Sequence, residues 1–171
     1  STKKPFSVTS NFLFPVKTDS TRSTVSKVSL FGGHSVAANA GTTKSLTWHA
    51  SDKTSFQVYF NKRDLDSPDG HFELSSHAGN FTTMTTPVIP AVYDNSHWSL
   101  TVRIGTRSDA EFTTVGPSSG NQYFIEFIGH EYETDVLKNT FHLSSSISAA
   151  DYDTLSKQNK ALYLGSHKTN F

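Results

Sequence analysis

The sequence predicts an all-β fold, an antiparallel two-sheet β-sandwich formed as a single domain by residues 1–171. Three observations support this prediction. Apolar and polar residues alternate over most of the chain, which is the pattern of half-buried strands. Thirteen Phe, six Tyr and two Trp, with many Thr and Ser, make a composition rich in strand-forming residues. A chain of 171 residues buries about 70% of its unfolded surface, which is enough for one core.

The strands are expected in a regular order along the chain. Between Phe6 and Val16 the apolar positions share one parity, so the first strand should bury one face. A second strand over residues 25–31 should end at Gly32-Gly33, and Asn39-Ala-Gly41 should form a turn. Alternating apolar residues predict the remaining strands at residues 46–50, 56–60, 72–74, 98–104, 123–128 and from Phe141 onward.

Turns and one helix separate these strands. Ser67-Pro-Asp-Gly70 predicts a tight turn, because Pro presets φ and Gly accepts a positive φ. Residues 82–90 are rich in Thr and contain two prolines, so an edge strand or a loop is expected there. Residues 148–158 form the one predicted helix, which is short, with Ser148 as its N-cap and Asp151 in the capping-box position.

Charge and composition exclude several classes of protein. The 15 basic and 15 acidic residues give a net charge of zero, which argues against a general nucleic-acid binder. No apolar run approaches the ~20 residues of a membrane helix, so no membrane span is expected. Cysteine is absent, which excludes disulfides and a cysteine nucleophile. Because the chain begins without Met, we interpret it as a processed or excised part of a larger protein.

Two stretches carry a resemblance to a known family. Asp94-Asn95 precedes His97-Trp98 at the start of an alternating strand, and Leu164-Gly165 stands near the end of the chain. From about residue 25 to residue 171 the order of motifs resembles the laminin-G-like branch of the concanavalin A-like lectin and glucanase family. That family commonly has Asp-Gly before Trp-His, so the order of Trp and His is reversed in His97-Trp98. It normally adds one more strand, which either residues 6–16 or a continuation of the chain would supply.

The resemblance implies a concanavalin A-like or jelly-roll sandwich that serves mainly as a binding scaffold. We therefore predict a non-enzymatic binding or structural module that recognises a glycan or a protein through surface loops. Such modules occur in extracellular matrix and adhesion proteins and on virus particles, so an extracellular or virion-surface location is expected. An alternative is a self-assembling jelly-roll shell (capsid) subunit, whose edge strands would pair in a homo-oligomer or a larger assembly.

A second alternative is a glycoside hydrolase. Glu131, Glu133 and Asp135 are spaced at i, i+2 and i+4, and on one strand they would share a face. Some glucanases of the same fold use such an acidic ladder, in which a nucleophile and an acid lie about 5 Å apart. Their order is Glu-x-Asp-x-Glu, whereas this chain has Glu-x-Glu-x-Asp. The competing interpretation is a solvated strand end or a loop after Gly129.

Metal binding is considered through the Asp residues of one loop. Laminin-G-like domains often bind calcium through loop Asp side chains, and Asp64, Asp66 and Asp69 surround the predicted turn at Gly70. Turn formation by Asp explains the same residues. No other cofactor is expected, since the eight His lack zinc-binding spacing. Asn80-Phe-Thr82 has the form of an N-glycosylation acceptor.

Aromatic residues are the remaining candidates for ligand contact. Trp48 and Trp98 are in phase with aliphatic neighbours, so we assign them to the core rather than to a sugar platform. Tyr59, Tyr93 and Tyr163 are out of phase or near turns. These three tyrosines are therefore the predicted surface residues for ligand binding.

Overall fold

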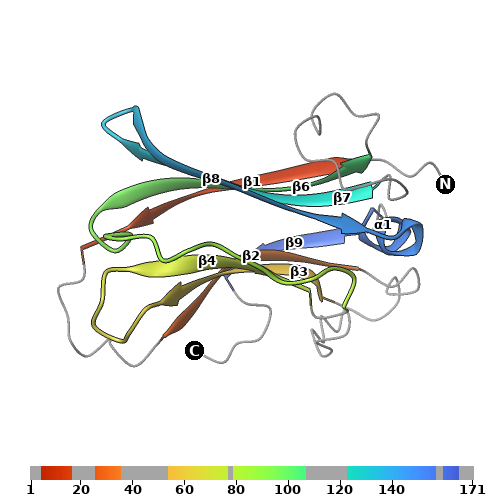
Figure 1. Ribbon diagram of the computed structural model, residues 1–171, viewed down its shortest axis with the longest axis horizontal. Coiled ribbons are helices and arrows are strands. Elements are labelled where there is room, and N and C mark those ends of the chain that lie inside the picture. The colour runs from red at the N-terminus through yellow and green to blue at the C-terminus, as the bar shows by residue number, and fades with distance from the viewer. Residues whose placement is uncertain are drawn as a thin grey trace.

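The computed structural model describes residues 5–16, 26–35, 54–76, 79–106, 123–156 and 160–165. In this part of the chain two antiparallel sheets stack as a β-sandwich with one short helix, which confirms the predicted fold class (Figure 1). The four-stranded sheet contains, in spatial order, β1 (Phe6–Phe14), β6 (Ser96–Thr106), β7 (Tyr123–Glu133) and β8 (Val136–Ile147). The five-stranded sheet contains β5 (Met84–Thr85), β4 (Gly70–Ser75), β3 (Thr54–Lys62), β2 (Lys27–Ser35) and β9 (Lys160–Leu164).

The first strand forms as the parity of its apolar residues predicts. β1 pairs antiparallel with β6 along its whole length, from Phe6 opposite Ile104 to Phe14 opposite Ser96. Burial alternates from residue to residue along β1, and Phe14 at its end is fully buried. β1 is one of the two outer strands of the four-stranded sheet, the other being β8, and one face of β1 is toward the core.

Aromatic side chains fill the space between the two sheets. The ring of Phe72 in β4 lies 4.9 Å from that of Trp98 in β6 and 5.6 Å from that of Phe141 in β8. Trp98 is 1% exposed, which confirms its assignment to the core. Burying one Phe side chain contributes about 1.5–3 kcal/mol, so these rings supply much of the driving force for folding. Trp48 and the predicted turn at Asn39–Gly41 lie outside the described residues.

Two glycine predictions are wrong for the same physical reason. β2 does not end at Gly32-Gly33 but continues through both glycines to Ser35. A Cβ on Gly33 would lie 2.7 Å from the ring of Phe56, so glycine is needed here for close packing and not for a turn. Gly70 begins β4, and the described glycines with a positive φ are Gly79 and Gly165. A Cβ on Gly70 would overlap the ring of Phe60.

β7 and β8 are both longer than the sequence predicts. β7 continues past residue 128 to Glu133, and β8 begins at Val136 rather than at Phe141. Gly129 lies inside β7 opposite Phe141, and a Cβ there would overlap three atoms of that ring. The glycine therefore lets the ring of Phe141 lie against the strand and approach Phe127, with the ring centroids 5.0 Å apart.

The predicted helix is present as α1 (Ala149–Leu155), which covers one end of the sandwich (Figure 1). Ser148 is its N-cap, and the Ser148 Oγ accepts a hydrogen bond from the Asp151 backbone N at 3.1 Å, as the capping pattern predicts. Tyr152 stacks on Tyr123 of β7 with the ring centroids 4.5 Å apart. No helix within the described ranges is long and apolar enough to span a membrane.

The side chain of Asn80 connects α1 to the segment that follows β4. Its Nδ2 donates to Asp151 Oδ1 at 2.9 Å, and the Ser148 hydroxyl donates to Asp151 Oδ2 at 2.6 Å. These hydrogen bonds, led by that of Ser148, lower the pKa of the Asp151 carboxyl. The amide nitrogen of Asn80, the first residue of the predicted Asn80-Phe-Thr82 acceptor, thus bonds to the helix, and its modification by a sugar stays a prediction.

The outward face of the four-stranded sheet carries a buried carboxylate. Glu126 on β7 is 2% exposed, and its Oε2 accepts from Arg103 Nε at 2.8 Å and Nη2 at 2.7 Å. Its Oε1 lies 2.8 Å from His142 Nε2 on β8. The three residues come from β6, β7 and β8, so the ion pair joins neighbouring strands.

Candidate functional site

An open groove of about 590 Å³ lies at the end of the four-stranded sheet away from α1. Three separate parts of the chain line it: Leu13 near the end of β1, the segment that enters β6, and the β7–β8 hairpin. Its lining residues are Leu13, Ala91, Asp94, Asn95, Ser96, His97, Glu131, Tyr132, Glu133, Thr134 and Asp135. The groove therefore contains all three residues of the predicted acidic ladder.

The two glutamates of that ladder project from the end of β7. Glu131 is opposite Trp98 in the strand register, so it lies on the inward face just beyond the aromatic core. Burial is the main cause that raises the pKa of the Glu131 carboxyl, and the charge of Glu133 raises it further, while Lys138 opposes the shift. The Glu133 Oε2 accepts from Lys138 Nζ at 2.6 Å. The groove thus holds one carboxyl with a raised pKa beside another that forms an ion pair.

Asp135 does not continue the ladder, so this part of the prediction is wrong. Glu133 pairs directly with Val136, and Thr134 and Asp135 form the two-residue turn between β7 and β8. Their φ values are 49° and 63°, a left-handed conformation that a β-branched Thr adopts only under strain. Of the competing interpretation, a solvated strand end or a loop after Gly129, the strand end is confirmed and the loop is wrong, because β7 continues through Gly129 and ends at Glu133, whose side chain is 66% exposed.

A row of side chains crosses the four-stranded sheet beside the groove. Leu13 pairs with His97, His97 pairs with Tyr132, and Tyr132 pairs with Leu137. Leu13 is 59% exposed, Tyr132 39% and Leu137 52%, so an aromatic ring and two aliphatic side chains face solvent. The pairing of β7 with β8 shifts register between Glu131 and Tyr132. Tyr132 and Leu137 therefore belong to the part of the hairpin beyond this shift.

Sequence reasoning did not select Asp94, His97 or Tyr132 as site residues. Asp94 and His97 belong to the motif that carries the family resemblance, and Tyr132 stands between two of the candidate glutamates. The strand register pairs His97 with Tyr132, and Asp94 lines the same groove from the segment that enters β6. The available signal was an aromatic residue inside an acidic stretch.

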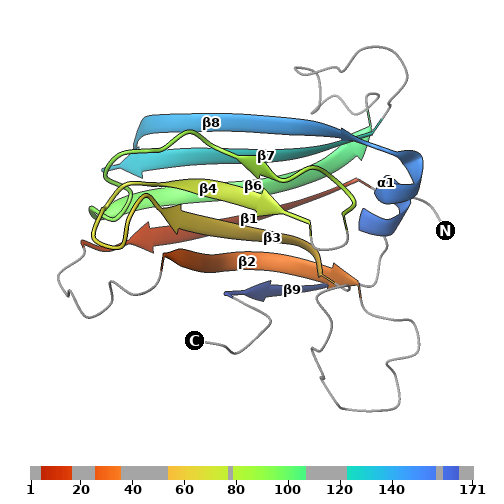
Figure 2. The same cartoon turned by 60° about the horizontal axis from the view of Figure 1, so that its bottom comes forward.

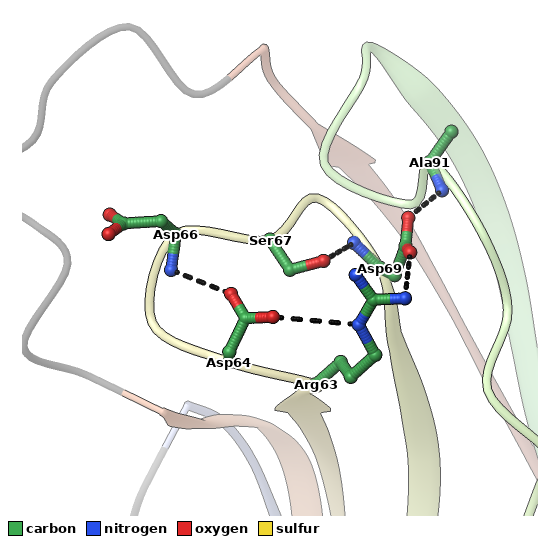
Figure 3. Close-up of polar contacts among 6 residues, drawn as sticks. All are labelled: Arg63, Asp64, Asp66, Ser67, Asp69 and Ala91. Carbon is green, nitrogen blue, oxygen red and sulfur yellow. Dashed lines mark hydrogen bonds and ion pairs between the residues drawn. The ribbon is translucent and has the colours of Figure 1, made fainter.

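The candidate calcium loop connects β3 and β4 and is held by its own side chains (Figure 3). Asp64 Oδ1 accepts from the backbone N of Asp66 at 3.2 Å, and the Asp69 backbone N donates to Ser67 Oγ at 3.1 Å. Arg63 forms ion pairs with Asp64 Oδ2 at 3.5 Å and Asp69 Oδ2 at 3.1 Å. These contacts are those of a turn built by Asp side chains.

The three carboxylates of this loop do not converge on one point. Figure 3 shows the Asp66 carboxylate pointing away from those of Asp64 and Asp69. Across the described ranges, no group of three or more His, Cys, Asp or Glu side chains is arranged to hold a metal ion. Calcium binding by these residues stays a prediction, and it would require the loop to rearrange.

The same loop supports one wall of the groove. Asp69 Oδ1 accepts from the backbone N of Ala91 at 2.9 Å (Figure 3), and Ala91 lines the groove with a φ of 55°. The backbone N of Tyr93 also donates to Pro68 O at 3.0 Å. Left-handed Ala is disfavoured by about 1 kcal/mol or more, so these contacts hold the segment in a conformation it would otherwise leave.

Two of the candidate tyrosines, Tyr59 and Tyr93, are not among the lining residues of the groove. Burial raises the pKa of Tyr93, whose ring lies 5.2 Å from that of Phe14 and therefore packs on the core. Tyr59 is on β3, with Lys27 Nζ 4.1 Å above its ring, and burial followed by the charge of Glu73 raises its pKa. Tyr163 lies in β9, and its side chain is outside what the structure describes.

Comparison with known proteins adds no family to this description. No family model, no curated protein sequence and no solved structure matches the chain. The resemblance to laminin-G-like domains therefore rests on the sequence motifs and stays a prediction.

Proposed function

We propose that this protein is a non-enzymatic recognition module that binds a glycan, or a protein segment with similar polar chemistry, in the groove at the end of the four-stranded sheet. The observation that carries the proposal is the composition of the groove. Asp94, Glu131, Glu133 and Asp135 supply carboxylate acceptors, and Tyr132, which is 39% exposed, is also a lining residue. Recognition of this kind fits a cell-surface or particle-surface location.

Sugar chemistry matches this lining. Sugar hydroxyls donate hydrogen bonds, and a charged acceptor makes such a bond worth about 1.5–3 kcal/mol. The apolar face of a sugar ring can stack on an exposed aromatic ring such as Tyr132. Among the described residues that line the groove there is no Lys or Arg. We therefore expect neutral or amine-bearing glycans to bind and sialylated or sulfated glycans to be rejected.

The test is a glycan array followed by titration of any hit. Tyr132→Ala should weaken binding by roughly tenfold, because stacking of an aromatic ring contributes about 1 kcal/mol beyond its buried area. Tyr59→Ala is the matched control, since Tyr59 lies on the other sheet, and it should leave affinity unchanged. Binding only to sialylated or sulfated glycans, or equal loss in both variants, would contradict the proposed site.

A second candidate function is glycoside hydrolysis, favoured by one specific observation. Two carboxyls stand close enough for the charge of Glu133 to raise the pKa of Glu131, and burial of Glu131 raises it more. Such a pair can divide the roles of proton donor and nucleophile. Turnover of an aryl β-glucoside or a β-glucan that disappears in both Glu131→Gln and Glu133→Gln would establish hydrolysis. Binding without turnover would leave the recognition module as the function.

A further inference from the structure

The two sheets differ by one strand on the side of the sandwich formed by β1 and β9. Phe12 of β1 stacks on Phe31 of β2 with the ring centroids 5.9 Å apart, so β2 lies opposite the outer strand of the four-stranded sheet. β9 is the next strand beyond β2, at the outer edge of the five-stranded sheet (Figure 2). In the part of the chain that the structure describes, no strand of the four-stranded sheet lies opposite β9.

Two leucines of β9 are exposed because of this difference. Leu162 is in register with Gly33 and Leu164 with Phe31, which is 2% exposed and faces the core. Both leucines therefore project from the inward face of their sheet, yet Leu162 is 54% and Leu164 75% exposed. Inward-facing leucines that remain exposed indicate a layer that is incomplete at this position.

The edge of β1 lacks the features that normally keep an edge strand from pairing. Residues 6–14 include no charged side chain and no proline, and they run for nine residues between Pro5 and Pro15. Natural edge strands are usually short, charged or interrupted, because an unprotected edge pairs with other strands. Among the described strands only β6 pairs with β1, so the other edge of β1, from Ser7 to Phe14, offers a ladder to an added strand at the position where the exposed leucines need cover.

We propose that an extended segment of a partner protein adds to the edge of β1 and covers Leu162 and Leu164. Added strands gain affinity from main-chain hydrogen bonds and specificity from alternate side chains. The occupant would be uncharged over this stretch, since β1 has no charge to pair with, and apolar at every second residue. The edge of β1 meets the groove at Leu13, but the acidic residues and Tyr132 that carry the groove proposal lie on neither β1 nor β9, so the two proposals rest on different residues.

A partner segment fits this position better than a second copy of the chain. If two copies of the chain paired through β1, their two β1 strands would be neighbours about 4.8 Å apart. The twofold axis that relates the copies would then run midway between these two strands. β9 extends beyond β2, on the side where that axis would fall. The two β9 strands would then compete for the same space, whereas a single added strand has room.

The experiment uses a fluorescent peptide of alternating Thr and Val, as long as β1 and with a lysine tail for solubility. We expect it to bind, to slow hydrogen exchange of the β1 amides, and to lose binding when alternate amides on its pairing edge are N-methylated. Leu164→Lys should reduce affinity by roughly tenfold or more, because the added strand would bury the new charge. Leu137→Lys is the control, since Leu137 is 52% exposed on the distant hairpin, and it should bind normally.

Several results would overturn the proposal. Full protection of the β1 amides in the free protein would show that the chain itself already covers the edge. A dimer in sedimentation that Leu164→Lys dissociates would make a second copy the occupant. Binding that neither Leu164→Lys nor N-methylation weakens would place the peptide elsewhere. A melting temperature of Leu164→Lys close to that of the wild type would show that the variant folds. This is expected, because the replaced side chain is 75% exposed.

Discussion

Replacing Arg103 should destabilise the protein because it leaves a buried carboxylate without its strongest partner. Glu126 is 2% exposed and receives two hydrogen bonds from Arg103, at 2.8 and 2.7 Å. Removing one partner of a buried ion pair costs about 3–5 kcal/mol. Arg103 is itself 18% exposed, and His142 Nε2 remains 2.8 Å from Glu126 Oε1. We therefore expect the lower end of that range, about 3 kcal/mol, for Arg103→Ala.

Urea unfolding, followed by the fluorescence of buried Trp98, measures this loss of stability. With a slope of about 2 kcal/mol per molar urea, the midpoint should fall by roughly 1.5 M. The melting temperature should fall by about 6–12 °C for a domain of this size. The double variant Arg103→Ala/Glu126→Gln tests whether the loss of stability is electrostatic, because a neutral glutamine side chain at position 126 leaves no buried charge without a partner. In the Glu126→Gln background the same Arg substitution should cost only about 1 kcal/mol. Equal costs in both backgrounds would refute the electrostatic explanation.

Three further predictions concern β7 and its hairpin. Gly129→Ala should destabilise the fold by about 2–3 kcal/mol, because the new Cβ would overlap the Phe141 ring, and calorimetry would measure it. An unchanged melting temperature would contradict that packing. Replacing Thr134-Asp135 by Asn-Gly should stabilise the hairpin by about 1–2 kcal/mol in urea unfolding, since both positions have positive φ; a loss of stability would count against the strained turn. The raised pKa of Glu131 means that the folded state holds a proton more tightly than the unfolded state. As pH rises from about 4.5 through the raised pKa, the free energy of unfolding of the wild type should therefore fall relative to that of Glu131→Gln. Parallel pH profiles of the two proteins would contradict this prediction.

Alternation alone predicted most of the strands, because one parity of apolar residues can only face one core. β1 and β6 follow this rule along their whole paired length. The glycines could not be interpreted in the same way. Gly33, Gly70 and Gly129 resemble turn or strand-end signals in the sequence, yet each allows a distant part of the chain to pack closely against the backbone. That information depends on how the strands pair, so the pattern of residues around each glycine does not contain it.

The candidate site was predicted in part. Glu131 and Glu133 were selected from their spacing, and both line the groove. The same spacing wrongly placed Asp135 on the strand, because Thr134-Asp135 lacks the Asn-Gly signature of a two-residue hairpin turn. The row that contains His97 and Tyr132 depends on the pairing of β6 with β7. Register between strands separated by a long connection is set by the whole core rather than by local sequence.

The contact between Asp69 and Ala91 has a practical consequence for anyone who redesigns this molecule. The connection between β3 and β4 looks like a free site for grafting a new peptide, since Arg63 and Asp64 are more than half exposed. Only one of its carboxylates, that of Asp69, reaches across to the backbone N of Ala91. A graft that keeps the length of the connection but omits an acceptor at this point should change the wall of the groove at Ala91 without replacing any residue that lines it. Libraries built on this scaffold should therefore keep Asp69 fixed while varying its neighbours.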